Sequence, residues 1–211
     1  MRYGKEHKKA TRQRIVETAG RRFKRDGIDG SGITALMKDA GLTNGAFYTH
    51  FASKDELVAT AIADQLHAQN TSVVAQAAPG RAGLEQIVRW YLSVQHRDNP
   101  DDGCPSAALL DEIRRCPDIV KRSYTDGVLV VIEGIAARLA PDNPLSVRTE
   151  ALTAYAMMAG TLQLARALAD SDLAGQLLDQ GVRNTLALLS AEAAPASPEE
   201  AGPRATRAST T

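Results

Sequence analysis

At two places within residues 1–54, basic side chains stand at the N-terminal ends of expected helices. The first group crowds the start of a helix expected over 6–25, and the second is Lys54 alone. A cation at a helix N-terminus opposes the helix dipole, at a cost on the order of a few tenths of a kcal/mol. A bound phosphate would compensate for that repulsion, so both groups are candidates for contact with a nucleic-acid backbone. The alternative is that these cations are only solvated. The first group comprises Lys8, Lys9, Arg12 and Arg14.

The distribution of charge along the chain supports the nucleic-acid interpretation. The 211 residues contain 25 basic and 25 acidic side chains, and the formal net charge is zero. Residues 1–54, however, carry 12 basic and 5 acidic side chains and a net charge of +7, while the remainder carries 13 and 20 and a net charge of −7. Binding to a polyanion is driven by release of its counterions, so a nucleic-acid-binding protein needs a basic charge only in the part that contacts the nucleic acid. The charge of residues 1–54 meets this requirement.

The residues around these cations predict two short helices joined by a tight turn. Apolar residues recur at helical spacing from Ile33 to Ala40, and Gly41 follows where a left-handed C-cap is needed. We expect the Thr43 hydroxyl to cap a second helix over 44–50. A helix, a glycine-containing turn and a second helix form the helix-turn-helix, whose second helix enters the major groove of DNA.

A further helix is expected to begin immediately after this unit and to run to about residue 70. Ser53 and Glu56 fit the capping box S-x-x-E. An apolar stripe follows, and it predicts the buried face of a helix that connects the two halves of the protein. The stripe comprises Leu57, Val58, Ala61, Ile62 and Leu66.

The run AGLTNGAFYTHFASKDEL, from Ala40 to Leu57, closely resembles the signature of the TetR (tetracycline-repressor) family. The resemblance implies a dimeric, all-helical transcription factor with an N-terminal DNA-binding domain and a C-terminal ligand-binding domain. It also implies that base edges or neighbouring backbone face Thr34, Thr43, Asn44, Gly45, Ala46 and Thr49, and that phosphates are held by Tyr48, His50 and Lys54. Family members carry Ser or Thr where this chain has Gly32, so either Ser31 replaces that phosphate contact or the contact is missing.

We therefore expect an all-α protein of about nine helices. The expected parts are a helix-turn-helix domain over 6–52, a ligand-binding and dimerisation domain over 53–190 and a disordered tail over 191–211. Residues 1–5 are expected to form a flexible basic arm, and 71–80 and 97–103 to be loops. The last two helices, expected over 146–169 and 172–190, contain many small residues that favour a dimer interface. The alternative is that these residues are buried within one chain.

The second domain could receive a regulatory signal at either of two kinds of site, a reactive cysteine or a ligand pocket. The segment from Gly103 to Leu109 resembles a Gly-Cys-containing subgroup of the family, some of whose members sense electrophiles or oxidants, and a thiol at a helix N-terminus is made more reactive. Alternatively, Cys104 only fills space in the core. A conventional pocket for a mostly apolar ligand could instead be lined by Trp90, Tyr91, His96, Tyr124, Tyr155 and Met158, although such residues are usually core.

The sequence predicts no catalytic residue, no metal site and no cofactor. It has no H-x-x-x-H, C-x-x-C, G-x-S-x-G or P-loop pattern, and its four histidines are scattered. No secretory signal or membrane segment is recognisable, so we expect a cytoplasmic protein with reduced cysteines.

The expected function is that of a sequence-specific DNA-binding regulator, a repressor released from a palindromic operator by a small apolar ligand or electrophile. Its expected partners are double-stranded operator DNA, an inducer and a second copy of the chain, without a membrane. The alternative is a helical ligand-binding protein that does not bind DNA.

Overall fold

The computed structural model describes residues 2–190, and the backbone over this range forms helices without a strand. The expected all-α fold is confirmed. The predicted tail over 191–211 lies outside the described residues. The α-helices are α1 (Arg2–Asp26), α2 (Ile33–Asp39), α3 (Asn44–Phe47), α4 (Lys54–Gln69), α5 (Gly80–Tyr91), α6 (Val94–Asp98), α7 (Ser106–Arg115), α8 (Asp118–Leu139), α9 (Arg148–Ala167) and α10 (Ser171–Leu188). Short turns of other helix types are η1 (Asn70–Val74), η2 (Pro100–Asp102) and η3 (Pro144–Val147).

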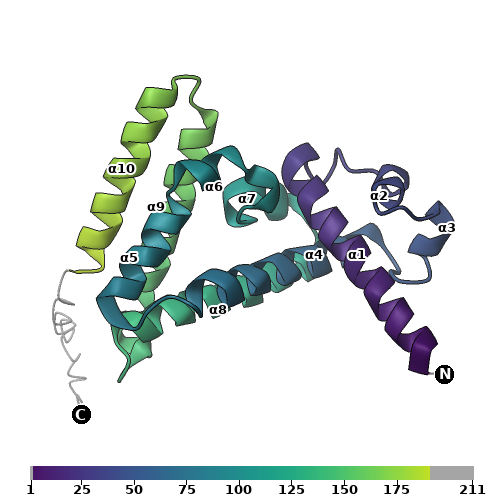
Figure 1. Cartoon of the computed structure of the whole chain (residues 1–211), viewed down its shortest axis with the longest axis horizontal. Coiled ribbons are helices and arrows are strands. Elements are labelled where there is room, and N and C mark those ends of the chain that lie inside the picture. Colours follow the sequence, from purple (N-terminus) through teal and green to yellow (C-terminus); the bar gives the residue numbers. More distant parts are fainter. Residues whose placement is uncertain (1, 191–211) are drawn as a thin grey trace, which may run out of the picture.

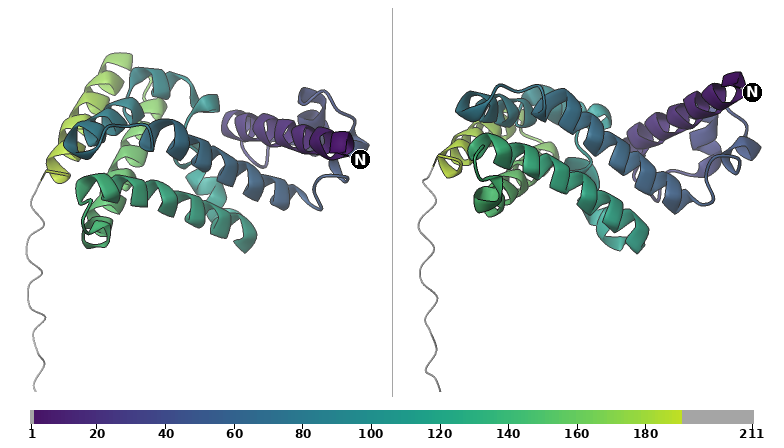
Figure 2. Two further views of the ribbon diagram at one scale, coloured as in Figure 1. Left: turned by 60° about the horizontal axis from the view of Figure 1, so that its bottom comes forward. Right: turned by 90° about the horizontal axis from the view of Figure 1, so that it is seen from below.

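The helices form two groups joined by α4, as Figure 1 shows. Helices α1, α2 and α3 lie at one end, and α1 packs against the first part of α4. At the other end α5, α9 and α10 stand together, while α8 runs beside α4 (Figures 1 and 2). The apolar core is continuous from Ile15 to Leu189, so α4 contributes to the packing of both groups. In residues 2–190, no helix is both long and apolar enough to span a bilayer.

The first group is a small bundle that fixes the turn between α2 and α3. Leu36 and Met37 of α2 are buried in the same core as Phe47 and Phe51, whose rings stack with their centroids 5.8 Å apart. Gly41 has φ +68°, the left-handed conformation expected after α2, which residues with a Cβ rarely adopt. The predicted helix-turn-helix is thus present.

The start of α4 is held by the predicted capping box. The Ser53 hydroxyl accepts the backbone N–H of Glu56 at 3.1 Å, and the Glu56 carboxylate accepts the N–H of Ala52 at 2.7 Å. Arg12 of α1 reaches the same place: its guanidinium lies 4.5 Å from the centre of the Phe51 ring and 3.8 Å from the Glu56 carboxylate. These contacts restrain the angle between α1 and α4.

Three predictions about the first group were wrong in detail. Helix α1 already includes residues 2–5, where a flexible arm was expected, because no capping residue at position 5 or 6 starts the helix later. The Thr43 side chain makes no capping hydrogen bond; the Ala46 N–H is bound instead by the Thr43 carbonyl at 3.1 Å. Helix α3 ends at Phe47, and 48–50 continue as a turn.

Two predicted loops contain helical turns. Residues 70–74 prolong α4 as a π-helical turn, in which the hydroxyls of Thr71 and Ser72 donate to carbonyls of the preceding turn at 2.9 and 2.7 Å. These polar residues suggested a loop, but their own hydroxyl bonds make them compatible with a helix. In the expected loop over 97–103, Asp98 ends α6 and 100–102 form η2. Ser93 caps α6 by accepting the His96 N–H at 3.1 Å.

The small residues of α9 and α10 divide between the interior and the surface. Several pack inside the chain, as the alternative interpretation expected: Ala154, Ala159, Ala165 and Ala174. Two others, Ala156 and Gly160, lie in an exposed stripe along α9 with a spacing of four residues, which also includes Leu152 and Leu164. Leu152 is 49% exposed and Leu164 is 54% exposed, so this stripe is apolar and uncovered in the single chain.

Candidate functional site

The surface formed by α2, α3 and the following turn carries the residues that were predicted to contact DNA. Most of them are exposed: Gly32, Thr34, Thr43, Asn44, Gly45, Tyr48 and Thr49. Ala46, His50 and Lys54 are partly exposed. The Tyr48 side chain is 68% exposed, while its neighbour Phe47 is fully buried and anchors the short helix in the bundle. The structure therefore gathers all ten residues at one end of the molecule.

Two side chains on this surface have restricted roles. The Thr49 hydroxyl donates to the Ala46 carbonyl at 2.7 Å, so toward DNA its oxygen can act only as an acceptor. Burial lowers the pKa of His50, and the positive charges of Lys8 and Arg12 act in the same direction. The neutral form of His50 is therefore favoured. Its Nδ1 is buried without a hydrogen-bond partner.

The basic side chains of α1 fall into two functionally different groups. Lys8, Lys9 and Arg14 are exposed near the start of the helix, as phosphate binding requires. The cations at its end have partners within the protein: Arg21 binds Asp102 at 3.1 Å, Arg22 binds Asp26 and Asp39, Arg25 binds Asp26, and Lys24 binds a backbone carbonyl.

Three of the predicted sensor residues meet, together with Ser106, in a polar cluster behind the Gly103–Cys104 segment. The Cys104 Sγ lies 3.2 Å from the Tyr155 hydroxyl, and the Ser106 hydroxyl lies 2.8 Å from that of Tyr155 and 2.9 Å from that of Tyr124. Burial raises the pKa of Tyr124, Tyr155 and the adjacent Tyr91. Because Cys104, Ser106, Tyr124 and Tyr155 satisfy one another, the cluster is a packed polar core. Met158 is buried in the apolar core instead.

His96 fixes the loop that carries Cys104. The Cys104 backbone N–H donates to His96 Nε2 at 3.0 Å, so Nδ1 carries the ring proton and donates to the Tyr91 carbonyl at 2.8 Å. Burial lowers the pKa of His96 to about 4, which keeps the ring neutral at pH 7. Gly103 allows this close approach, since a Cβ there would lie 2.7 Å from His96 Nε2.

Arg166, which the sequence analysis did not single out, connects the same loop to α9. Its guanidinium donates to three backbone carbonyls: that of His96 at 2.7 Å, that of Ala107 at 3.0 Å and that of Arg97 at 3.2 Å. A single arginine near the end of a long helix gives no sequence signal for such a contact.

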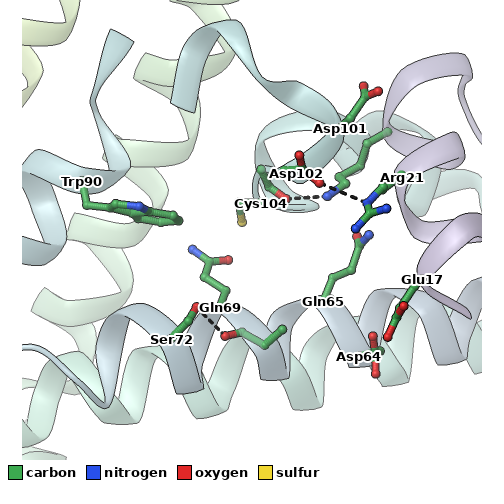
Figure 3. A pocket seen from close by; sticks show the side chains of 13 residues that line it. Glu17, Arg21, Asp64, Gln65, Gln69, Ser72, Trp90, Asp101, Asp102 and Cys104 are labelled. Carbon is green, nitrogen blue, oxygen red and sulfur yellow. Dashed lines mark hydrogen bonds and ion pairs between the residues drawn. The ribbon is translucent and has the colours of Figure 1, made fainter. Parts of the chain in front are cut away.

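A cavity of about 220 Å³ opens beside this loop, between α1, α4 and α5 (Figure 3). Of the predicted pocket residues, Trp90 and Cys104 line it. The sequence did not indicate its other polar members, among them Lys24, Gln69 and Asp101. They come from segments that are distant in sequence and share no periodic pattern.

Structures with the same fold cover nearly the whole chain. The reduced form of NemR from E. coli superposes with a TM-score of 0.68 at 18% identity, over 83% of this chain and 95% of that one. FadR from Bacillus subtilis, in complex with stearoyl-CoA, gives 0.62 at 16% identity over 84% and 96%. At these identities the likeness establishes the fold.

The sequence of the helix-turn-helix region is similar to that of known regulators. Residues 15–61 match the profile described as "Bacterial regulatory proteins, tetR family". The regulator TtgR of Pseudomonas putida is 41% identical over 63 residues, and AcrR of Shigella flexneri is 38% identical over 53. The helix-turn-helix region of this chain is therefore of the TetR/AcrR type. The similarity spans 30% of this chain and 30% of TtgR, and 25% of this chain and of AcrR.

The TetR profile extends from the middle of α1 into α4, so it includes the exposed surface described above. The segment with Cys104 and the cavity residues of α5 and η2 lie outside it. The profile match therefore covers the residues that were predicted to contact DNA, and both these contacts and membership of the Gly-Cys-containing subgroup stay predictions.

Proposed function

We propose that this protein is a TetR-type transcriptional repressor that binds a palindromic operator as a dimer and is released by a small ligand. The observation that carries the proposal is the exposed face of α3, where the buried Phe47 holds Tyr48 and Asn44 outward. That face follows the basic start of α1, within a segment of net charge +7. A surface of this charge and shape fits the major groove and its phosphates.

In this proposal, base edges or neighbouring backbone face the side chains and small residues of α2 and α3, and phosphates bind Tyr48, His50 and Lys54. The α3 helices of two protomers would lie about 34–36 Å apart on successive major grooves. The exposed stripe of α9 is the proposed dimer contact, together with α10. We place the boundary between the DNA-binding and ligand-binding domains at 52–53 and the protein in the cytoplasm.

A ligand would act by binding more tightly to a conformation whose α3 spacing does not fit DNA. The continuous core through α4 supports such coupling, since α4 packs against both α1 and α8. The solved FadR structure of the same fold holds stearoyl-CoA, which supports ligand binding by this architecture. Modification of Cys104 by an electrophile is the second candidate signal, because this residue, although buried against Tyr155, borders a cavity.

The proposal is tested by selecting binding sites from random double-stranded DNA. We expect a palindrome whose half-sites are centred about one helical turn apart, bound by two chains. The Tyr48→Phe variant, which lacks the exposed hydroxyl, should bind that site more weakly. Recovery of no sequence above background at low salt would instead favour the helical binding protein without DNA affinity.

A further inference from the structure

The cavity beside the Gly103–Cys104 loop is formed by both groups of helices. Helix α1 contributes one wall, α4 and η1 form the floor, Trp90 of α5 lies at one end and η2 lies at the other (Figure 3). Its volume of about 220 Å³ exceeds the roughly 150 Å³ that suffices for a benzene ring. A molecule with one or two rings would fit, and it would touch the DNA-binding bundle and the C-terminal helices together.

Gln69 supplies an unsatisfied hydrogen-bonding group in this cavity. The residue is 9% exposed, and its Oε1 is buried without a hydrogen-bond partner. Figure 3 shows its amide turned into the space between Trp90 and Gln65. Because a buried carbonyl oxygen without a partner is unfavourable, a ligand with a donor at this point would be bound in preference to one without.

Trp90 supplies an aromatic wall for the same space. One face of its indole stacks on His96, with ring centroids 4.9 Å apart and the planes 26° from parallel. The side chain is still 39% exposed, and it lies at one end of the cavity. An indole held in place on one side binds a second aromatic ring or a cation with little loss of side-chain entropy.

The charge around the cavity is negative. Four acidic and two basic side chains line it within the described residues, and both basic groups are engaged: Arg21 with Asp102, and Lys24 with the Gly103 carbonyl. Asp101 lies at the end opposite Trp90, the acidic end of the cavity (Figure 3), and no ion pair engages it within residues 2–190, whereas the neighbouring Asp102 is paired with Arg21. An anionic ligand would be repelled, whereas a positive charge directed away from Trp90 would approach the Asp101 carboxylate.

We propose that this cavity binds a small aromatic amine, with its ring at Trp90, an N–H donated to Gln69 Oε1 and its ammonium group facing the acidic end. The regulatory consequence rests on the function proposed above. A ligand at this position would lie between α1 and α4, and would therefore change the placement of α3 relative to the C-terminal helices.

Three probes with the same ring test the ligand class: phenethylamine, phenethyl alcohol and phenylacetate. Binding is followed through the fluorescence of Trp90, the only tryptophan of the chain. We expect the amine to bind at least tenfold more tightly than the carboxylate, with the alcohol between them. Equal binding of the carboxylate, or no response to the amine at millimolar concentration, would overturn the proposal.

A pair of variants tests the site itself. Gln69→Leu removes the acceptor and should weaken amine binding about tenfold, the usual effect of losing a charge-assisted hydrogen bond. Gln95→Leu makes the same change at an exposed position of α6 and should leave the affinity unaltered. Amine binding that is unchanged in Gln69→Leu would place the ligand elsewhere. Calorimetry of Trp90→Leu, which should lose binding, provides a readout independent of fluorescence.

The result is separable from the proposed function because amine binding is measured without DNA. Amine binding by a protein that selects no operator would refute the repressor proposal and leave the cavity assignment intact. Operator binding without any response to the amine would refute only the cavity assignment.

Discussion

At the residue scale, the side chains that we propose to face DNA differ in the contacts that they can make. Tyr48 is exposed and offers its hydroxyl freely, whereas the hydroxyl proton of Thr49 is already donated within the turn. Lys54 lies at the N-terminus of α4, where the helix dipole also favours an anion. We therefore expect Tyr48 and Lys54 to dominate the phosphate contacts, and base discrimination to come from Thr34, Asn44 and the small residues beside it.

The Lys54→Ala variant should weaken operator binding and flatten its dependence on salt. Removal of one phosphate contact reduces the slope of log K against log salt concentration by about 0.9. The measurement is a titration of operator DNA at several salt concentrations, with Lys121→Ala on α8 as the control. An unchanged slope for Lys54→Ala would remove this residue from the phosphate contacts.

Lys24 should make the stability of the protein change with pH in the alkaline range. Burial lowers the pKa of this side chain from 10.5 to about 8, although Asp102 acts in the opposite direction. Between those values the unfolded chain binds more protons than the folded one, so stability attributable to Lys24 rises with pH. Between pH 8 and 10.5, the free energy of unfolding of the wild-type protein should rise by roughly 3 kcal/mol relative to that of Lys24→Met. Denaturant unfolding of both proteins at each pH measures the difference; parallel curves would contradict it.

At the element scale, the connection between the two groups of helices depends on a few contacts outside α4. Glu112 of α7 accepts the backbone N–H of Ile28 at 2.6 Å and that of Asp29 at 3.3 Å. These two residues lie in the turn between α1 and α2, so one carboxylate joins the helix after Cys104 to the DNA-binding bundle. Lys24 and Arg21 make a second connection, to the loop before α7.

The Glu112→Gln variant should loosen the turn between α1 and α2. A neutral amide binds the two N–H groups less strongly than a carboxylate does, and exchange of the Ile28 and Asp29 amide protons should become about tenfold faster. Hydrogen exchange followed by NMR measures this effect. Asp111→Asn on the same helix, where the carboxylate pairs with arginines at the surface, is the matched control. Equal exchange in wild type and Glu112→Gln would show that this carboxylate does not restrain the turn.

At the scale of the whole molecule, two exposed apolar sites on the C-terminal helices differ in extent. The exposed stripe of α9 continues over several turns, whereas Ile119 of α8 is an isolated exposed side chain near the other end of the C-terminal group. Arg166 joins α9 to the loop beside the cavity by a hydrogen bond, and α9 also carries the proposed dimer contact. In a dimer formed through α9, this helix would therefore connect each cavity to the interface between the protomers.

Leu164→Asp should produce a monomer with greatly weakened operator affinity. A charge within the proposed contact would have to be desolvated in the dimer, and a single half-site provides only part of the binding energy. Sedimentation velocity gives the oligomeric state, and a gel shift gives the affinity. Ile119→Asp should leave both unchanged. A dimer that persists in Leu164→Asp would exclude the α9 stripe as its interface.

The sequence by itself determined the helix-turn-helix and the capping box, because their signals are local. Ile33 to Ala40, Gly41 and the Ser53–Glu56 pair act within one or two helical turns. Even here Thr43 was misjudged, since the choice between a side-chain and a backbone cap depends on how α3 packs through Phe47.

Only the tertiary structure decided which side chains share a cavity. Lys24, Gln69, Trp90 and Asp101 belong to four segments, and each alone resembles an ordinary surface or core residue. The cluster of Cys104, Ser106 and Tyr155 is a second example. Cys104 and Tyr155 were expected to belong to a sensor or ligand site, but their hydrogen bonds within the cluster place them in a packed polar core. The physical reason is that burial and pairing depend on distances between helices, which periodicity within one helix does not specify.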